Sequence, residues 1–157
     1  MDSYVLDDTD FGILNYLQQD ARLTYKELAH KLNRSQSPIQ DRVKRLEKLG
    51  YIRGYVALVD YDRLRSCMMA YLQVQLKDHA ADALERFQGE VCLYPEVLEC
   101  HHTTGGYDFL LKVVTNDIRH YREFLWQRLG KVANVGSINS SVVIGQAKLQ
   151  TAVPVGE

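Results

Sequence analysis

Residues 24–52 read TYKELAHKLNRSQSPIQDRVKRLEKLGYI, and this stretch predicts two short helices joined by a tight turn. The first helix starts at a capping box, in which Thr24 and Glu27 satisfy each other's backbone donors. Asn33 tolerates the left-handed backbone that a turn requires, and Gly50 supplies a left-handed position where the second helix ends. We therefore expect a helix, a turn and a helix within this stretch.

The second helix carries one apolar stripe and a polar, largely basic opposite face. Either Ser35 or Ser37 can cap it, with Pro38 tolerated in the first turn. The apolar stripe, at about 100° per residue, consists of Ile39, Val43, Leu46 and Leu49. In proteins that read DNA, such a second helix lies in the major groove with its first residues at base edges and its cations near phosphates. The helix pair therefore predicts binding to double-stranded DNA.

Two groups of side chains in this stretch are candidates for DNA contacts. Base reading is expected from Gln36, Ser37 and Gln40, because a Gln amide offers adenine both a donor and an acceptor, and a Ser hydroxyl serves either role. Phosphate neutralisation is expected from the cations Arg34, Arg42, Lys44, Arg45 and Lys48.

Arg42 and Asp41 each have two readings. Arg42 lies close to the apolar stripe, so an ion pair that holds the fold together is as good an expectation as a phosphate contact. Asp41 on the groove face repels phosphate, and we expect it to pair with Arg45 one turn on, with acceptance from a cytosine amino group as the alternative.

Charge is distributed unevenly along the chain. Residues 22–53 hold nine Lys or Arg and three acidic residues, whereas the whole chain holds 19 and 20 and has a net charge of −1. A basic face is often only a solvated one, but the local surplus favours a DNA contact. The balanced total argues against indiscriminate binding to nucleic acid.

Composition is that of a soluble globular protein: 157 residues, 46% hydrophobic and 25% charged. No apolar run approaches membrane-spanning length, and the start MDSYVLDD is acidic, so we expect a cytoplasmic protein with no membrane partner. Cys67, Cys92 and Cys100 form an odd set without a CxxC pair, which argues against a disulfide framework and a zinc site. We expect them to be buried thiols.

The remaining chain predicts one more N-terminal helix and a sheet domain. Asp7 and Asp8 can cap a helix that precedes residue 20, residues 53–64 look extended, and 63–66 is a plausible junction. The rest predicts strand, helix, strand, strand, helix and strand, over the stretches 68–77, 80–93, 97–104, 107–115, a helix capped by Asn116 or Asp117, and 137–149. Two split βαβ units give an antiparallel four-stranded sheet with both helices on one face and the other face open to a partner.

Three segments together resemble the Lrp/AsnC family of bacterial and archaeal transcription regulators, the feast/famine proteins. They are LDDTDFGILNYLQQDARLTYKELAHKLNRS, the SQSPIQDRVKRLEKLGYIRGYVALVD block, and TTGGYDFLLKVV followed by a last VVI strand. The resemblance covers nearly the whole chain and implies an α+β architecture. It implies a three-helix winged or extended helix-turn-helix domain in 1–53, a hinge strand and linker in 54–66, and a βαββαβ ferredoxin-like (ACT-like, RAM) effector and assembly domain in 67–157.

The same resemblance implies dimers that assemble further, commonly to octamers, and a small effector, usually an amino acid, bound between dimers. No cofactor and no metal are expected. The family's effector loop falls on Thr103, Thr104, Gly105, Gly106, Tyr107 and Asp108, and Ser140 matches a family position that often carries Thr or Ser. Glycines let backbone amides approach a ligand carboxylate, and Asp108 can accept from an α-amino group. The alternative is an ordinary Gly-Gly hairpin turn that only supports assembly.

Two departures from the family's common pattern bear on the effector. Gly106 stands where the loop often has an acidic residue, which affects the side chain that the loop accepts. His101 and His102 precede the loop, and neighbours in a strand point to opposite faces, so they cannot chelate one metal together. One of them can line the ligand pocket or an interface, while plain strand packing is the alternative.

Three functions remain open on the sequence. The leading one is a ligand-responsive, sequence-specific DNA-binding regulator, and the second is an architectural DNA-wrapping protein that needs no effector. The third is an enzyme built on Cys100 with His101 and His102, or on Asp108 with a His, which we do not expect. Sequence neighbours in a strand cannot face each other as nucleophile and base, and no nucleophile elbow, phosphate loop, HExxH or paired-Cys metal motif is present.

Overall fold

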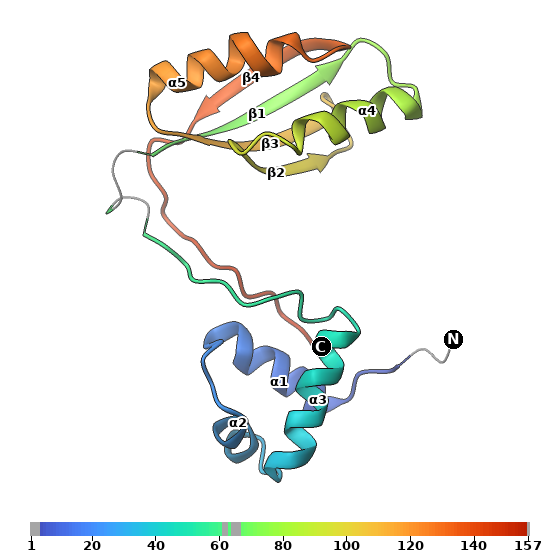
Figure 1. Cartoon of the computed structure of the whole chain (residues 1–157), viewed down its shortest axis with the longest axis vertical. Coiled ribbons are helices and arrows are strands. Elements are labelled where there is room, and N and C mark those ends of the chain that lie inside the picture. Colours follow the sequence, from blue (N-terminus) through green and yellow to red (C-terminus); the bar gives the residue numbers. More distant parts are fainter. Residues whose placement is uncertain (1–3, 61–62, 64–66, 157) are drawn as a thin grey trace. The chain divides into compact units, whose positions relative to one another are not determined.

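The computed structural model describes residues 4–60, 63 and 67–156 and divides the chain into two compact units (Figure 1). Unit 1 contains the chain up to Leu58 together with the C-terminal segment from Lys148, and unit 2 contains the residues between Val59 and Ala147. The C-terminal segment thus groups with the N-terminal helices, whereas sequence reasoning assigned it to the sheet domain of 67–157.

Unit 1 contains three helices, α1 (Asp8–Gln19), α2 (Tyr25–Lys31) and α3 (Gln36–Lys48). Local signals set their ends as expected. Thr24 and Glu27 form the predicted capping box of α2, and Asp7 forms a second one with Asp10 at the start of α1. The backbone is left-handed at Asn33, with φ of 52°, and at Gly50, with φ of 81°. The N-cap of α3 is Ser35, although its side chain makes no capping hydrogen bond.

The core of unit 1 is a small apolar cluster to which all three helices contribute. Its buried members are Ile13, Leu28, Ala29, Ile39, Val43 and Leu46. The predicted stripe of α3 is therefore the buried one, except that Leu49 remains 48% exposed beyond the helix end. Residues 53–60, expected to be extended, belong to no helix or strand.

The carboxylate of Asp7, which caps α1, makes the stability of unit 1 depend on pH. The backbone amide of Asp10 and the guanidinium of Arg42 hold the pKa of Asp7 below its usual value of 3.8. A carboxylate with a lowered pKa stabilises the fold fully above its unfolded pKa, and this contribution is lost as pH falls through the lower folded-state pKa.

We predict that Asp7→Asn makes the unfolding midpoint of the full chain less sensitive to pH below about 4, because the titrating group is removed. Urea unfolding followed by circular dichroism across that pH range measures the effect. Asp8→Asn, which changes the neighbouring carboxylate of the same turn, is the matched control. An equal flattening in both variants would show that net charge is responsible and that the cap is not.

Unit 2 is a four-stranded antiparallel sheet with its helices on one face (Figure 1). Its elements are β1 (Met68–Leu76), α4 (Ala81–Val91), β2 (Val97–His102), β3 (Phe109–Thr115), α5 (Ile118–Glu123) and β4 (Val135–Val142), in the sheet order β2-β3-β1-β4. Asp117 caps α5, and a π-helical turn at Phe124–Arg128 continues it. The last strand ends at Val142, earlier than the predicted 149.

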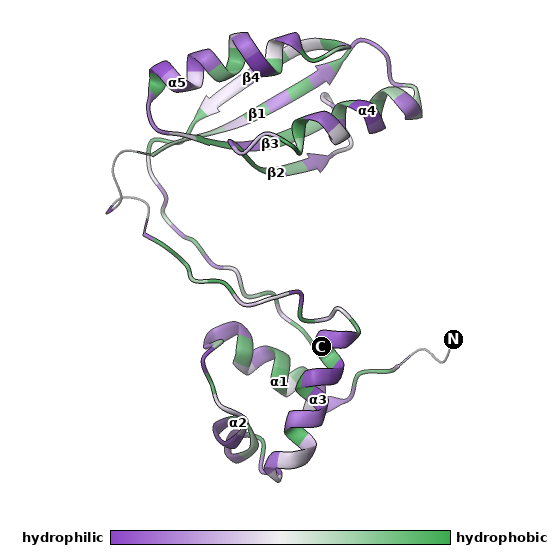
Figure 2. Ribbon diagram, in the orientation of Figure 1, coloured by the Kyte–Doolittle hydropathy of each residue, from purple (hydrophilic) through white to green (hydrophobic). Residues whose placement is uncertain are grey.

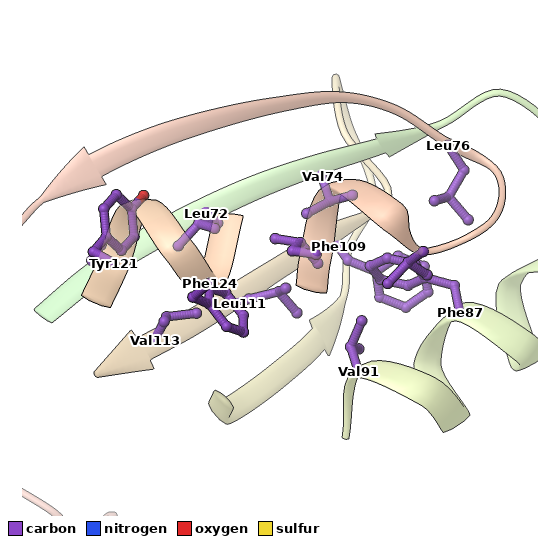
Figure 3. Packing of buried hydrophobic residues seen from close by; sticks show 13 residues of the cluster. Leu72, Val74, Leu76, Phe87, Val91, Phe109, Leu111, Val113, Tyr121 and Phe124 are labelled. Atoms are coloured by element: carbon purple, nitrogen blue, oxygen red, sulfur yellow. The ribbon is translucent and has the colours of Figure 1, made fainter. Parts of the chain in front are cut away.

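Alternation along the strands separates a packed face from an open one. Leu72, Val74, Leu111 and Val113 lie under the helices with no exposed surface, and Figure 3 shows Phe87, Val91, Tyr121 and Phe124 packed against them. The alternate positions of β1 and β3, among them Tyr71, Gln73, Leu110 and Lys112, point to the other face and are half-buried. Figure 2 shows this alternation along β1, whereas β4 is pale to purple along most of its length.

Two expectations about composition can be compared with the structure. The three cysteines were expected to be buried, and this is wrong for Cys67 and Cys92, which are exposed, while Cys100 is half-buried. Within the described ranges, every helix is too short or too polar to cross a lipid bilayer.

Candidate DNA-binding surface and effector loop

The predicted base-reading residues lie together at the N-terminal end of α3. Gln36 is the first residue of the helix, Ser37 follows it, and Gln40 comes one turn later on the same side. Gln36 and Ser37 are exposed and Gln40 is half-buried. The apolar stripe through Ile39 and Val43 fixes this orientation, because burying it in unit 1 turns the polar residues outward.

The predicted phosphate contacts lie in the turn before α3 and along its exposed face. Arg34, Lys44, Arg45 and Lys48 are all exposed. In the part of the chain that the structure describes, no carboxylate forms an ion pair with any of these four. The Arg45 guanidinium lies 5.2 Å from the centroid of the Tyr4 ring, which is a cation–π contact. The four cations therefore keep their charge available at the surface.

Arg42 forms ion pairs that hold the fold together, which is one of the two roles that the sequence left open. Its Nη1 lies 2.8 Å from Asp10 Oδ1 and 2.8 Å from an Asp7 carboxylate oxygen, and its side chain is 29% exposed. Asp10 is fully buried and also accepts from the Tyr4 hydroxyl at 2.6 Å. The hydrogen bond to Asp10 is the main cause that raises the pKa of Arg42. Arg42 thus ties α3 to α1, and a phosphate contact by the same residue stays a prediction.

The predicted ion pair between Asp41 and Arg45 is absent from the structure over residues 4–60. The Arg45 guanidinium instead lies over Tyr4, which comes from the segment before α1. Asp41 is exposed. The expected one-turn pairing is therefore wrong, because a contact with a residue distant in the sequence takes the cation.

The predicted effector loop joins β2 to β3 as a closed hairpin. The Thr103 amide donates to the Asp108 carbonyl at 2.9 Å, and the Thr103 hydroxyl donates to the Tyr107 carbonyl at 3.2 Å. Gly105 has φ of +120°, a conformation that other residues rarely adopt, whereas Gly106 does not have a positive φ. Nothing lies within 4 Å of the position of a Cβ on Gly106, so its lack of a side chain is not imposed by the loop itself.

Asp108 is the best-anchored residue of the loop. Its Oδ2 accepts from the Leu76 amide at 2.7 Å, its Oδ1 lies 3.0 Å from His79 Nδ1, and its amide donates to the Val74 carbonyl at 2.9 Å. The Asp108 side chain is 17% exposed. Each carboxylate oxygen has a second lone pair, so these partners leave room for one more donor.

His79 is a residue that sequence reasoning missed. It lies in the connection between β1 and α4, and its side chain is 57% exposed beside Asp108. Nothing in its sequence neighbourhood indicates this contact, because the pairing depends on the register that brings Asp108 beside the end of β1.

Ser140 does not join the loop within one chain. It pairs with Leu72 from β4, while the loop is anchored beside Val74 and Leu76 and belongs to β3. Strands β3 and β4 lie on opposite sides of β1. Ser140 is exposed on β4, so β1 lies between it and the loop.

The residues that precede the loop point to alternate faces, as expected. Cys100 pairs with the buried Leu111, and His102 stacks on Phe109 with ring centroids 5.0 Å apart. His101 points to the open face, where its Nε2 lies 3.2 Å from Glu99 Oε2. Burial raises the pKa of Cys100 to about 12, so its thiol stays protonated. The three residues therefore form no nucleophile and base pair, and the described part of the chain contains no cluster of metal-ligating side chains.

Both units match models of known protein families. A model described as the Lrp/AsnC ligand binding domain matches residues 69–153, and one described as winged helix-turn-helix DNA-binding matches residues 6–53. The Bkd operon transcriptional regulator of Pseudomonas aeruginosa is 36% identical over 95% of this chain and 97% of its own length. The leucine-responsive regulatory protein of Escherichia coli is 35% identical over 91% and 87% of the two chains.

Solved structures show the same similarity. A transcriptional regulator from Neisseria meningitidis, crystallised as a complex with L-methionine, has a TM-score of 0.88 and 35% identity over 96% of this chain and 97% of its own. An AsnC family transcriptional regulator from Agrobacterium tumefaciens has a TM-score of 0.87 and 31% identity over the same shares of the two chains.

Proposed function

Because the chain belongs to the Lrp/AsnC family of transcriptional regulators, we propose that it reads DNA with the N-terminal end of α3 and responds to an amino acid bound at the loop 103–108. It is a regulator that binds specific DNA, and its relatives are regulators of transcription and are not enzymes. A DNA-binding regulator acts where the chromosome is, so we place it in the cytoplasm.

The DNA-binding role is supported most directly by the outward face of α3. Exposed Gln36 and Ser37, with Gln40 one turn on, are the residues that we assign to base edges. Exposed Arg34, Lys44, Arg45 and Lys48 supply charge for phosphates, and no carboxylate among the described residues pairs with them. Arg42 supports them indirectly by holding α3 against α1 through Asp7 and Asp10.

The effector role is supported by the chemistry of the loop. An amino acid carries a carboxylate, which suits backbone amides around Gly105 and Gly106, and an ammonium group, which suits the remaining lone pairs of Asp108. The Neisseria relative was crystallised with L-methionine, an amino acid whose side chain is uncharged. We propose that Thr103, Thr104 and Tyr107 shape the same site and that Ser140 joins it from a second copy of the chain.

A second copy also suits the open face of the sheet. Met69, Tyr71, Leu110 and Val114 are half-buried on this face, where the described residues provide no covering helix. Packing two such faces buries apolar surface at roughly 25 cal/mol per Å². We propose a dimer through this face and assembly of dimers into a larger ring such as an octamer.

Three measurements on one preparation test this function. Light scattering gives the assembly state, a thermal-shift panel of the twenty amino acids identifies an effector, and binding to the DNA upstream of the protein's own gene is measured with and without each hit. We expect an oligomer, at least one stabilising amino acid, and DNA affinity that changes when it is present. An oligomer that binds DNA with no amino acid giving a shift would favour the architectural DNA-wrapping protein.

Gln40→Ala is expected to relax sequence preference without weakening binding to all DNA. A bidentate amide contact to adenine discriminates against other bases by about 1–3 kcal/mol, so affinity for the best site falls while affinity for unrelated duplex stays unchanged. The ratio of the two dissociation constants at fixed salt measures this. Gln19→Ala, at an exposed glutamine of α1, is the control. Equal losses on both kinds of DNA would remove Gln40 from the base-reading set.

A further inference from the structure

The C-terminal segment, residues 148–156, lies along one stripe of α1. This α1 stripe consists of Phe11, Asn15 and Gln18, which are four and three residues apart and so share one side of the helix. Asn15 Nδ2 donates to the Val155 carbonyl at 3.3 Å, and both polar groups of Gln18 bond to Val153. Contacts between residues about 135 positions apart thus build part of unit 1.

The side-chain amide of Gln18 bonds to both backbone groups of Val153, as the backbone of a neighbouring β-strand would. Its Nε2 donates to the Val153 carbonyl at 3.0 Å, and its Oε1 accepts from the Val153 amide at 2.8 Å. One amide side chain therefore satisfies both backbone groups of one residue. The Val153 side chain is 60% exposed, so this contact depends on the backbone and on Gln18, and only slightly on the valine.

Apolar contacts accompany these hydrogen bonds at the end of the segment. Gly156 has φ of +83°, and a Cβ at this position would come within 2.8 Å of the Phe11 ring. Ala152 and Val155 are half-buried. The segment is therefore seated on the α1 stripe through a close approach that only glycine permits at its end.

The chain connects the two units twice. It leaves unit 1 after Leu58 and returns to it at Lys148, only a few residues after β4 ends at Val142. Ser140, which we assign to the effector site, lies in β4, eight residues before the returning segment begins at Lys148. Releasing the C-terminal segment from α1 would leave the units joined by a single connection, which allows the DNA-binding helices a wider range of positions.

We propose that the α1 stripe is a docking site for the C-terminal segment and that this docking transmits the effector state of unit 2 to the DNA-binding unit. The inference rests on the proposed function for its effector. It assigns to Gln18 a positioning role that neither touches DNA nor contacts the amino acid. The hydrogen bonds involved are exposed, so they can open and close without unfolding α1.

Hydrogen exchange in the full-length chain tests the docking without any effector. Gln18→Ala is expected to speed exchange of the Val153 amide at least about tenfold, because the acceptor that protects it is removed. Gln19→Ala is the matched control, since it removes an exposed glutamine from the same turn of α1. Gly156→Ala, which disturbs the segment and leaves α1 intact, should speed the same exchange. Unchanged exchange in both Gln18→Ala and Gly156→Ala would overturn the docking.

The coupling is tested with the twenty amino acids, each measured for its thermal shift and for the ratio of DNA dissociation constants with and without it. We expect Gln18→Ala to keep the thermal shift and lose the change in DNA affinity, so that the ratio falls to about one, while Gln19→Ala keeps both. A ratio unchanged in Gln18→Ala would overturn the coupling. If no amino acid shifts the wild-type chain, the proposed effector function fails instead, and the exchange result still decides the docking.

Discussion

Replacing Lys44 and Arg45 together with alanine is expected to weaken binding to every duplex about 30-fold at 0.15 M salt, if each cation meets one phosphate. Each phosphate contact adds about 0.9 to the slope of log K against log salt, so the double variant should lower that slope by about 1.8. Both side chains are exposed on α3, and neither is paired with a carboxylate over residues 4–60. Titrations of specific and unrelated duplexes at several salt concentrations measure the loss and the slope together.

The matched control removes the same two charges from unit 2. Arg119 and Lys131 are both exposed, and their replacement by alanine should leave the salt slope unchanged. Arg45 also lies over Tyr4, so its loss removes a cation–π contact worth about 0.5–1 kcal/mol of stability. The single variant Lys44→Ala has no such contact and should give about half the change in slope. A full loss of affinity in the unit 2 control would show that overall charge is responsible.

Features set by neighbours in the sequence were predictable. The capping box of Thr24 and Glu27, the left-handed Asn33 and Gly50, and the buried stripe of α3 were all read correctly from spacing alone. The fold of unit 2 followed from alternation and from the Gly-Gly hairpin, because period and turn chemistry are local properties. Its strand ends were less predictable, since the end of β4 depends on where its partner strand stops.

Features set by distant residues were not predictable in the same way. The sequence left Arg42 between two roles, and the choice follows from Asp7 and Asp10 on another helix. Arg45 does not pair with Asp41, one turn away, and its guanidinium lies over the ring of Tyr4, which is distant in the sequence. The docking of Val153 on Gln18 involves backbone groups, which carry no signature in the sequence. Side-chain pattern therefore predicts elements and faces well, and it predicts long-range partners poorly.

The candidate effector site also combines features that are set by neighbours in the sequence with features that are set by distant residues. The loop 103–108 was found by its glycines and by resemblance, and the structure confirms the turn chemistry at Gly105. The contact between Asp108 and His79 was missed, because it joins the loop to a connection 29 residues earlier. Ser140 lies on β4, on the other side of β1 from the loop, a separation that follows from the strand order and not from neighbours in the sequence.

Asp108→Ala should abolish the thermal shift that an amino acid gives the wild-type chain. A ligand at a hundred times its Kd stabilises the folded state by about 2.7 kcal/mol, which corresponds to a shift of roughly 10 °C or more for a domain of this size. The same substitution leaves the Leu76 amide without its acceptor, which costs about 1–3 kcal/mol if the amide stays buried. A loss of amino-acid binding must therefore be distinguished from a loss of stability of the fold itself.

Asp108→Asn makes that separation. Its amide oxygen can still accept from the Leu76 amide, and its NH₂ group can donate to His79 Nδ1, so the melting temperature without ligand should stay closer to wild type than in Asp108→Ala. The charge that attracts the α-ammonium group is gone, so the amino-acid shift should still be lost. Asp78→Ala, a neighbouring carboxylate that accepts from the Ala80 amide, is the control and should keep the shift. A full shift in Asp108→Asn would mean that Asp108 only anchors the hairpin to β1, and that the ammonium group is bound elsewhere.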